Sequence, residues 1–196
     1  MSDQCCGGGC GSSGERPKDV SQQEIFFGIA RDCSSRSTCV KTKTGAVIVK
    51  DGEVLSTSQN LCAPDGCEYG DKVERCPREG MKTGTGYELC QPMHAEVMAC
   101  LNAKAEKLSP QQMAQFAGHL VPSAEAILAA FAPDDLVRLN GATLYLVGHY
   151  WACENCKRFC RIVGVQEILF DPVTGKATEE KYKVQGLTNE SPPAVQ

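Results

Sequence analysis

Two short motifs bring metal-binding and acid–base side chains to the starts of two predicted helices. His94 and Glu96 are separated by one residue, and Cys153 and Cys156 by two. Cysteines three positions apart project from one helical face, and the first helical turn favours the thiolate. His94, Cys153 and Cys156 would leave the fourth position of a tetrahedral zinc ion open, which is typical of catalytic zinc. The motifs together predict a catalytic zinc site, with Glu96 as the acid–base group beside it.

Hydrophobic patterning predicts an alternation of helices and strands around these motifs. A capping box begins at Ser21, and a β-branched run before Asp51-Gly52 predicts a β-hairpin. We expect helices at 21–33, 93–107 and 153–163, short helices within 109–139, and strands at 44–50, 53–59, 142–147 and 165–170. The short strand–helix–strand unit at the end implies a parallel pair with a right-handed crossover. The sequence therefore predicts an α/β fold with a mixed sheet.

Composition excludes several classes of protein. The 20 Lys and Arg residues are outnumbered by 24 Asp and Glu, so a strongly basic nucleic-acid-binding protein is excluded. The chain has no apolar run of 18 residues and no apolar core of a secretory signal near Met1, so we expect no membrane partner. Thirteen cysteines without an export signal indicate a reducing, cytoplasmic compartment, where cysteines bind metals or catalyse.

Further motifs surround the two helix starts. They are Arg36-Ser37-Thr38-Cys39, Gly45-Ala46-Val47-Ile48-Val49-Lys50-Asp51, Asn60, Ala63-Pro64, Cys76-Pro77-Arg78, Glu88-Leu89-Cys90 and His94-Ala95-Glu96. In this order they resemble the deoxycytidylate deaminase family, within the cytidine-deaminase-like zinc deaminases. The resemblance covers roughly residues 21–170. It implies a three-layer α/β/α fold around a five-stranded mixed sheet.

The resemblance implies zinc-dependent hydrolytic deamination of dCMP to dUMP. Zinc lowers the pKa of a bound water, and Glu96 accepts the proton and returns protons to ring N3 and the leaving ammonia. Asn60 matches the residue that contacts the sugar, and Ala95 is a further substrate-binding residue. Arg36 and Arg78 are candidates for the phosphate, although exposed arginines are common without a ligand. The expected partner is a small nucleotide rather than a polynucleotide, and the resemblance suggests a homo-oligomer.

Three departures from the family pattern leave alternatives open. Ala152 stands where a proline usually precedes the first cysteine, Met98 replaces a common asparagine, and the glycines flanking Asn60 are replaced. In regulated members that loop is associated with nucleoside triphosphates, so allosteric control is in doubt. The alternatives are a deaminase of another cytosine nucleotide or base, and an inactive metal-binding homologue. The presence of Glu96 beside three suitable ligands favours an active enzyme.

The chain divides into three expected parts. Residues 1–19 are a Gly/Cys-rich, flexible tail, 20–171 form the deaminase domain, and 172–196 form a C-terminal tail. The domain carries a helical insert at about 108–140 that is longer than the resemblance leads us to expect.

The loop at 60–91 is long and polar, and therefore requires a tether. The resemblance implies a second, structural zinc that joins this loop to the segment before the first strand. Its predicted ligands are Cys39, Cys67, Cys76 and Cys90, with Cys62 as a substitute. Four thiolates would close a tetrahedral site, as structural zinc requires. Unliganded, reduced cysteines are the alternative.

Overall fold

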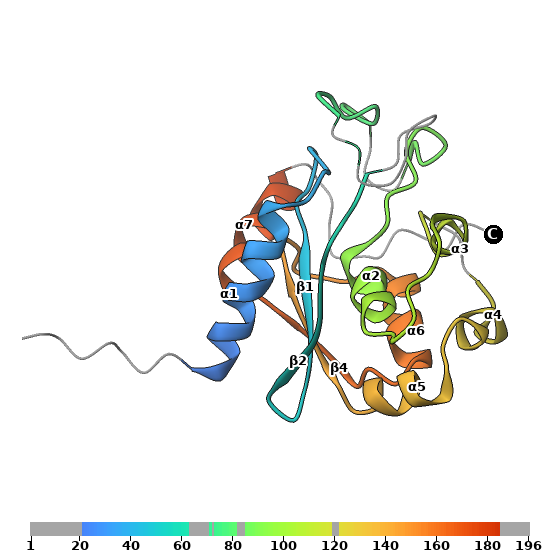
Figure 1. Ribbon diagram of the computed structural model, residues 1–196. Coiled ribbons are helices and arrows are strands. Elements are labelled where there is room, and N and C mark those ends of the chain that lie inside the picture. Colours follow the sequence, from blue (N-terminus) through green and yellow to red (C-terminus); the bar gives the residue numbers. More distant parts are fainter. Residues whose placement is uncertain (1–20, 63–70, 72, 82–84, 119–121, 185–196) are drawn as a thin grey trace, which may run out of the picture.

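The computed structural model describes residues 21–62, 71, 73–81, 85–118 and 122–184 (Figure 1). The predicted N-terminal tail and Cys67 lie outside this part of the chain.

The described strands form one mixed sheet in the order β2-β1-β3-β4. β1 (Gly45–Lys50) pairs antiparallel with both β2 (Glu53–Gln59) and β3 (Thr143–Val147). β3 pairs parallel with β4 (Glu167–Phe170), as the predicted crossover requires. β1 and β3 therefore lie at the centre, and both are almost wholly buried. The predicted α/β fold with a mixed sheet is confirmed.

Helices cover both faces of this sheet. α1 (Gln22–Ser35) and α7 (Pro172–Val184) lie on one side, and α2 (Ala95–Asn102) and α6 (Glu154–Ile162) lie on the other (Figure 1). The predicted insert contains three short helices beyond α2 and α6. They are α3 (Pro110–Ala114), α4 (Ala124–Ala129) and α5 (Pro133–Leu139). None of the described helices combines the length and apolar character needed to cross a bilayer.

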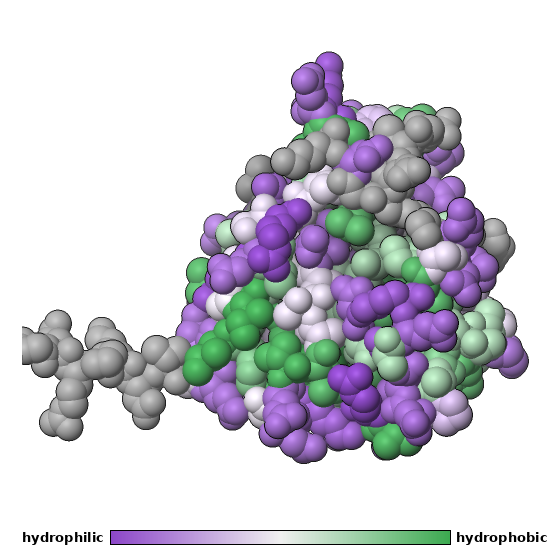
Figure 2. All heavy atoms as spheres, in the orientation of Figure 1, coloured by the Kyte–Doolittle hydropathy of each residue, from purple (hydrophilic) through white to green (hydrophobic). Residues whose placement is uncertain are grey.

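Alternate residues of the central strands build the two cores. Ile48 and Leu144 point toward α2 and α6, whereas their neighbours Val47 and Tyr145 point toward α1. On that second face, the rings of the two α1 phenylalanines pack 5.1 and 5.2 Å from the Tyr145 ring. The outer surface mixes hydrophilic and hydrophobic side chains, with a hydrophobic cluster over part of α1 and β2 (Figure 2).

Local signals in the sequence account for several element boundaries. The Ser21 hydroxyl accepts a hydrogen bond from the Glu24 amide and begins α1. Asp51 and Gly52 have positive φ values of 52° and 82°, as a two-residue hairpin turn requires. The expected helix at 93–107 is shorter, because α2 ends at Asn102.

A five-stranded sheet is not confirmed. Within the described residues the sheet has four strands, and the chain after β4 forms α7. The first part of the predicted C-terminal tail is therefore helical. Asp171 explains why a helix begins here, because its carboxylate accepts hydrogen bonds from the amides of Val173 and Thr174.

The insert is fastened to the domain by buried polar contacts. The buried Asp135 carboxylate accepts hydrogen bonds from the amides of Ala105 and Ala132. Phe116 and Phe131 pack edge-on against Phe159 of α6. The insert therefore lies against the helix that carries the two-cysteine motif.

Gly45 allows α1 to approach the start of β1 closely. A Cβ atom there would lie 2.0 Å from the Ala30 carbonyl oxygen and 2.6 Å from the Ser34 nitrogen. We expect Gly45→Ala to lower the free energy of unfolding by about 3 kcal/mol or more in urea denaturation. Gly28→Ala is the matched control, since no atom lies within 4 Å of its added Cβ. That substitution should raise stability by about 0.5–1 kcal/mol. Equal effects of the two variants would contradict this packing.

Candidate metal centre

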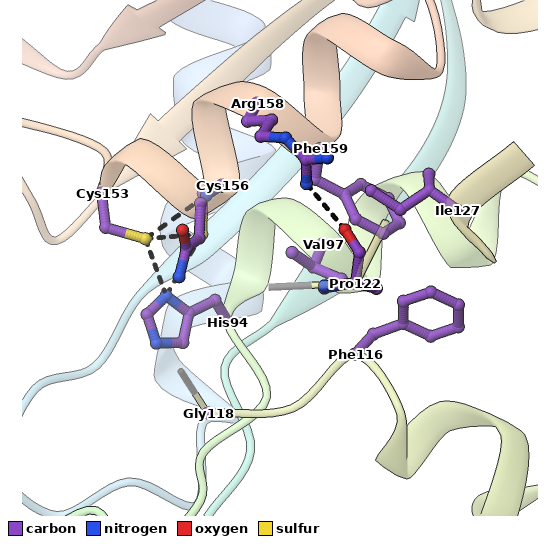
Figure 3. Close-up of a pocket in the computed structure, with 11 residues that line it drawn as sticks. His94, Val97, Phe116, Gly118, Pro122, Ile127, Cys153, Cys156, Arg158 and Phe159 are labelled. Carbon is purple, nitrogen blue, oxygen red and sulfur yellow. Dashed lines mark hydrogen bonds between the residues drawn. The ribbon is translucent and has the colours of Figure 1, made fainter. Parts of the chain in front are cut away.

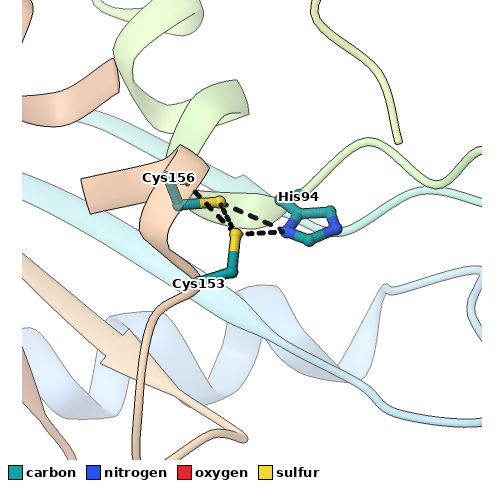
Figure 4. Close-up of side chains that lie close together, drawn as sticks. All are labelled: His94, Cys153 and Cys156. Carbon is teal, nitrogen blue, oxygen red and sulfur yellow. Dashed lines mark hydrogen bonds between the residues drawn. The ribbon is translucent and has the colours of Figure 1, made fainter. Parts of the chain in front are cut away.

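Two helices begin at the same place on one face of the sheet. His94 is the N-cap of α2 and Cys153 is the N-cap of α6 (Figure 4). The sequence predicts both residues inside the first helical turn, whereas the structure places each of them one residue before its helix. The backbone of His94 is extended rather than helical. The direction of its side chain relative to Glu96 is therefore not set by the helical repeat.

Backbone contacts fix the approach to His94. The amides of Leu61 and Met93 donate to each other's carbonyl oxygens at 3.0 and 2.9 Å. This isolated bridge ties the chain just after β2 to the residue before His94. The Met93 side chain is fully buried, so the bridge is anchored in the core.

The three predicted ligands converge. His94 Nδ1 lies 3.2 Å from Cys156 Sγ and 3.7 Å from Cys153 Sγ, and the two sulfur atoms are 3.1 Å apart. Ligands bonded to tetrahedral zinc at ~2.0–2.3 Å lie about 3.5–3.8 Å from one another. Among the described residues, no other group of three or more such donors gathers within 4.8 Å. The donor set fits a zinc ion, and Cys156 Sγ would move away from the other two donors by about 0.3–0.7 Å to hold it.

The charges of these donors are strongly coupled. The hydrogen bond with Cys156 and the nearby imidazole hold the pKa of Cys153 down to about 4. Burial is the largest single effect and would lower the pKa of His94, but the hydrogen bond with Cys153 and the charges of Cys153 and Glu96 together raise that pKa to about 9. The hydrogen bond between Cys153 and Cys156, together with burial, raises the pKa of Cys156. The shifts therefore favour the charged forms of Cys153 and His94, each of which stabilises the charge of the other.

Glu96 lies in the first turn of α2 and is 5% exposed. Burial raises the pKa of its carboxyl group, and the nearby His94 charge opposes that effect. Its side chain also interacts with the Cys156 thiol. The structure thus brings the predicted acid–base group to the three donor atoms.

A cavity of about 20 Å³ lies beside the donors, which is room for about one water molecule (Figure 3). The insert forms one wall of it through Phe116 and Ile127, and α6 forms another through Phe159. Arg158 Nη1 donates to the Pro122 carbonyl oxygen at 2.7 Å and joins the two walls. The sequence did not reveal this role of the insert, because no local pattern indicates that Phe116 and Ile127 pack beside the metal donors.

Asn60, the predicted sugar contact, is buried at the end of β2. Its Oδ1 accepts from the Ser37 hydroxyl at 2.6 Å and the Thr44 amide at 2.8 Å, and its Nδ2 donates to the Thr42 carbonyl oxygen. The side chain therefore anchors the segment before β1. One of its two Nδ2 hydrogens is not used in these bonds.

The other three predicted substrate residues occupy different environments. Arg78 is buried, stacks 3.7 Å from the centre of the Tyr87 ring, and lies near enough to His94 for its charge to oppose imidazole protonation. Arg36 is exposed and its Nη2 contacts Cys33 Sγ at 3.2 Å. Ala95 is fully buried beside the metal donors.

A second group of thiols joins the start of the long loop to the segment before β1. Cys62 interacts through hydrogen bonds with both Cys39 and Cys90. Its bond to Cys39 lowers the pKa of that thiol to about 6. Cys62, the predicted substitute, therefore lies beside Cys39, while Cys67 lies outside the described residues.

Comparison with known proteins agrees with this geometry. Residues 20–171 match the family described as the cytidine and deoxycytidylate deaminase zinc-binding region. The chain belongs to this family of zinc-binding deaminases. It is 38% identical over 92 residues to the deoxycytidylate deaminase of Mycobacterium phage D29, which covers 43% of this chain and 69% of the phage protein.

Similar solved structures include the dCMP deaminase of cyanophage S-TIM5. Its apo form is 19% identical, with a TM-score of 0.43, and covers 76% of this chain and 80% of its own. Its complex with dCMP and dUMP is also 19% identical, with a TM-score of 0.45, and covers 87% and 94%.

Proposed function

We propose that this protein catalyses the zinc-dependent hydrolytic deamination of dCMP to dUMP. The observation that carries the proposal is the convergence of two thiols, one imidazole and the buried Glu96 carboxyl group in a chain of this deaminase family. The phage relative, a deoxycytidylate deaminase by name, supports dCMP as the substrate. Another cytosine nucleotide is the second candidate, and the assay below separates the two.

His94, Cys153 and Cys156 would hold the zinc ion. When bound, zinc supplies a nucleophile near neutral pH by lowering the pKa of a water molecule. Glu96 then accepts a proton, delivers one to ring N3, and protonates the departing amino group. One water is consumed, and dUMP and ammonia leave. The buried walls around Glu96 exclude other solvent, so its proton transfers are confined to water and substrate.

We propose that the substrate enters between β2 and the start of α2. Asn60 would donate its remaining Nδ2 hydrogen to the sugar, and Ala95 would line the base. Arg78 is the better candidate for the phosphate, since it is buried near His94 whereas the exposed Arg36 contacts Cys33.

We further propose that the deaminase domain begins at residue 20, as predicted, and extends beyond the predicted end at 171 to include α7, because α7 is hydrogen-bonded to Gly148. A homo-oligomer rests on the family resemblance alone. A reducing, cytoplasmic compartment is supported by the nine described cysteines, which are all free thiols.

A second, structural zinc is also part of the proposal. Cys39 and Cys90 each contact Cys62, and the two would have to move closer to each other to share one ion with it. Cys67 in the same loop is the candidate for the fourth ligand. A metal there would add folding free energy to a segment with little apolar material. Relative to the expected set, Cys62 replaces Cys76.

Metal analysis of the purified protein tests both sites. We expect two zinc ions per chain, one of which is lost in Cys156→Ser and the other in Cys62→Ser. Cys160→Ser is the matched control, because Cys160 is buried one turn beyond Cys156 and contacts Cys100 instead. It should retain both ions. One zinc per wild-type chain would contradict the structural site, and full zinc retention in Cys156→Ser would contradict the catalytic one.

Glu96→Gln should retain zinc and lose about 10²–10⁴-fold in kcat for ammonia release from dCMP, because the amide cannot accept a proton. Glu154→Gln is the control, since that exposed carboxylate pairs with Lys157 at the start of α6. Assays with dCMP, CMP and deoxycytidine define the substrate. Near wild-type turnover by Glu96→Gln would refute the acid–base role. A higher kcat/KM for CMP than for dCMP would show that CMP is the substrate instead.

A further inference from the structure

Helix α7 is hydrogen-bonded to Gly148, the residue that directly follows the central strand β3. The Gly148 amide donates to the Thr174 hydroxyl at 3.1 Å. The Thr178 hydroxyl shares its hydrogen between the Thr174 carbonyl oxygen at 2.9 Å and the Gly148 carbonyl oxygen at 3.2 Å. On its other side, a Cβ on Gly148 would lie 2.0 Å from the Lys43 carbonyl oxygen. With a φ of 90°, Gly148 is therefore clamped between α7 and the segment before β1.

The Thr174 hydroxyl is itself held in place by a hydrogen bond to Asp171. It donates to Asp171 Oδ2 at 2.8 Å, so its donor and its acceptor functions are both used. Asp171 is fully buried and also receives two hydrogen bonds from the Arg31 guanidinium of α1, at 2.8 and 3.1 Å. The clamp on Gly148 is thus connected to α1 through charge-assisted hydrogen bonds.

Gly148 is joined to Cys153 by only four residues. Their far end is fixed because Cys153 caps α6, and their near end is fixed by Thr174. The loop also lies directly on α7, where a Cβ on Gly175 would be 3.6 Å from Tyr150 Cβ. A metal ligand must be held within about 0.5 Å of its productive position. A shift at Gly148 would therefore be transmitted to Cys153.

We propose that Thr174 is a positioning residue for the metal centre, through its hydrogen bonds to Asp171 and Gly148. The proposal rests on the proposed zinc site at His94, Cys153 and Cys156. Thr174 touches neither metal nor substrate, and acts on the Cys153 ligand through the backbone of the loop. A valine at this position keeps the shape of the side chain but leaves the Gly148 amide without its acceptor. A serine keeps both hydrogen bonds.

Cobalt substitution tests this role without reference to turnover. The visible spectrum of bound Co²⁺ reports ligand geometry at the site, and the variants leave the thiol cluster of Cys39, Cys62 and Cys90 unchanged. We expect Thr174→Val to alter that spectrum and to weaken Co²⁺ affinity about 10–100-fold. Thr174→Ser should restore both. Phe26→Leu is the control for general destabilisation, because Phe26 packs on Tyr145 in the other core.

Each outcome bears on a distinct claim. A wild-type spectrum and wild-type Co²⁺ affinity in Thr174→Val would overturn the positioning role. So would a loss of affinity in Thr174→Ser or Phe26→Leu as large as that in Thr174→Val. Hydrogen exchange of the Gly148 amide in the wild-type protein tests it even if Thr174→Val does not fold. Strong protection is expected, and rapid exchange would overturn the role. Failure of the wild-type protein to bind Co²⁺ through His94, Cys153 and Cys156 would overturn the proposed function itself.

Discussion

The meeting of two helix starts at one point is the constraint on which the rest of the structure depends. His94 and Cys153 are separated by 59 positions in the sequence, yet their donor atoms lie 3.7 Å apart. The meeting requires α2 and α6 to pack on the same face of the sheet, with β1 and β3 adjacent at its centre. The Leu61–Met93 bridge fixes one approach, and the clamp on Gly148 fixes the other.

The local chemistry follows from this placement. Helix starts present unpaired amides and a partial positive charge, which favour thiolates. The Cys156 amide indeed donates to Cys153 Sγ at 3.4 Å. Glu96 is drawn into the same buried environment because it lies in the first turn of α2. The insert adds apolar walls and narrows the space beside the donors to about 20 Å³. Acid–base and metal-binding groups are thereby gathered where water is scarce.

Short-range patterns in the sequence were sufficient for much of this account. Ser21 and Asp51-Gly52 each act through neighbours a few residues away, and their predicted roles as helix cap and hairpin turn are confirmed. Features set by long-range contact were not predictable. Nothing near Cys62 in the sequence shows that it contacts both Cys39 and Cys90. By contrast, the helix α7 was missed although a local signal marks its start, because Asp171 caps it and Pro172 is its first residue.

The central claim is that zinc at this site makes the protein a deaminase of a cytosine nucleotide. The most direct measurement is ammonia release from dCMP while metal-free protein is titrated with zinc. We expect no ammonia without metal, and activity that rises with zinc until the site at His94, Cys153 and Cys156 is filled. Equal activity of the metal-free protein, or no ammonia from dCMP or CMP at full zinc occupancy, would contradict it.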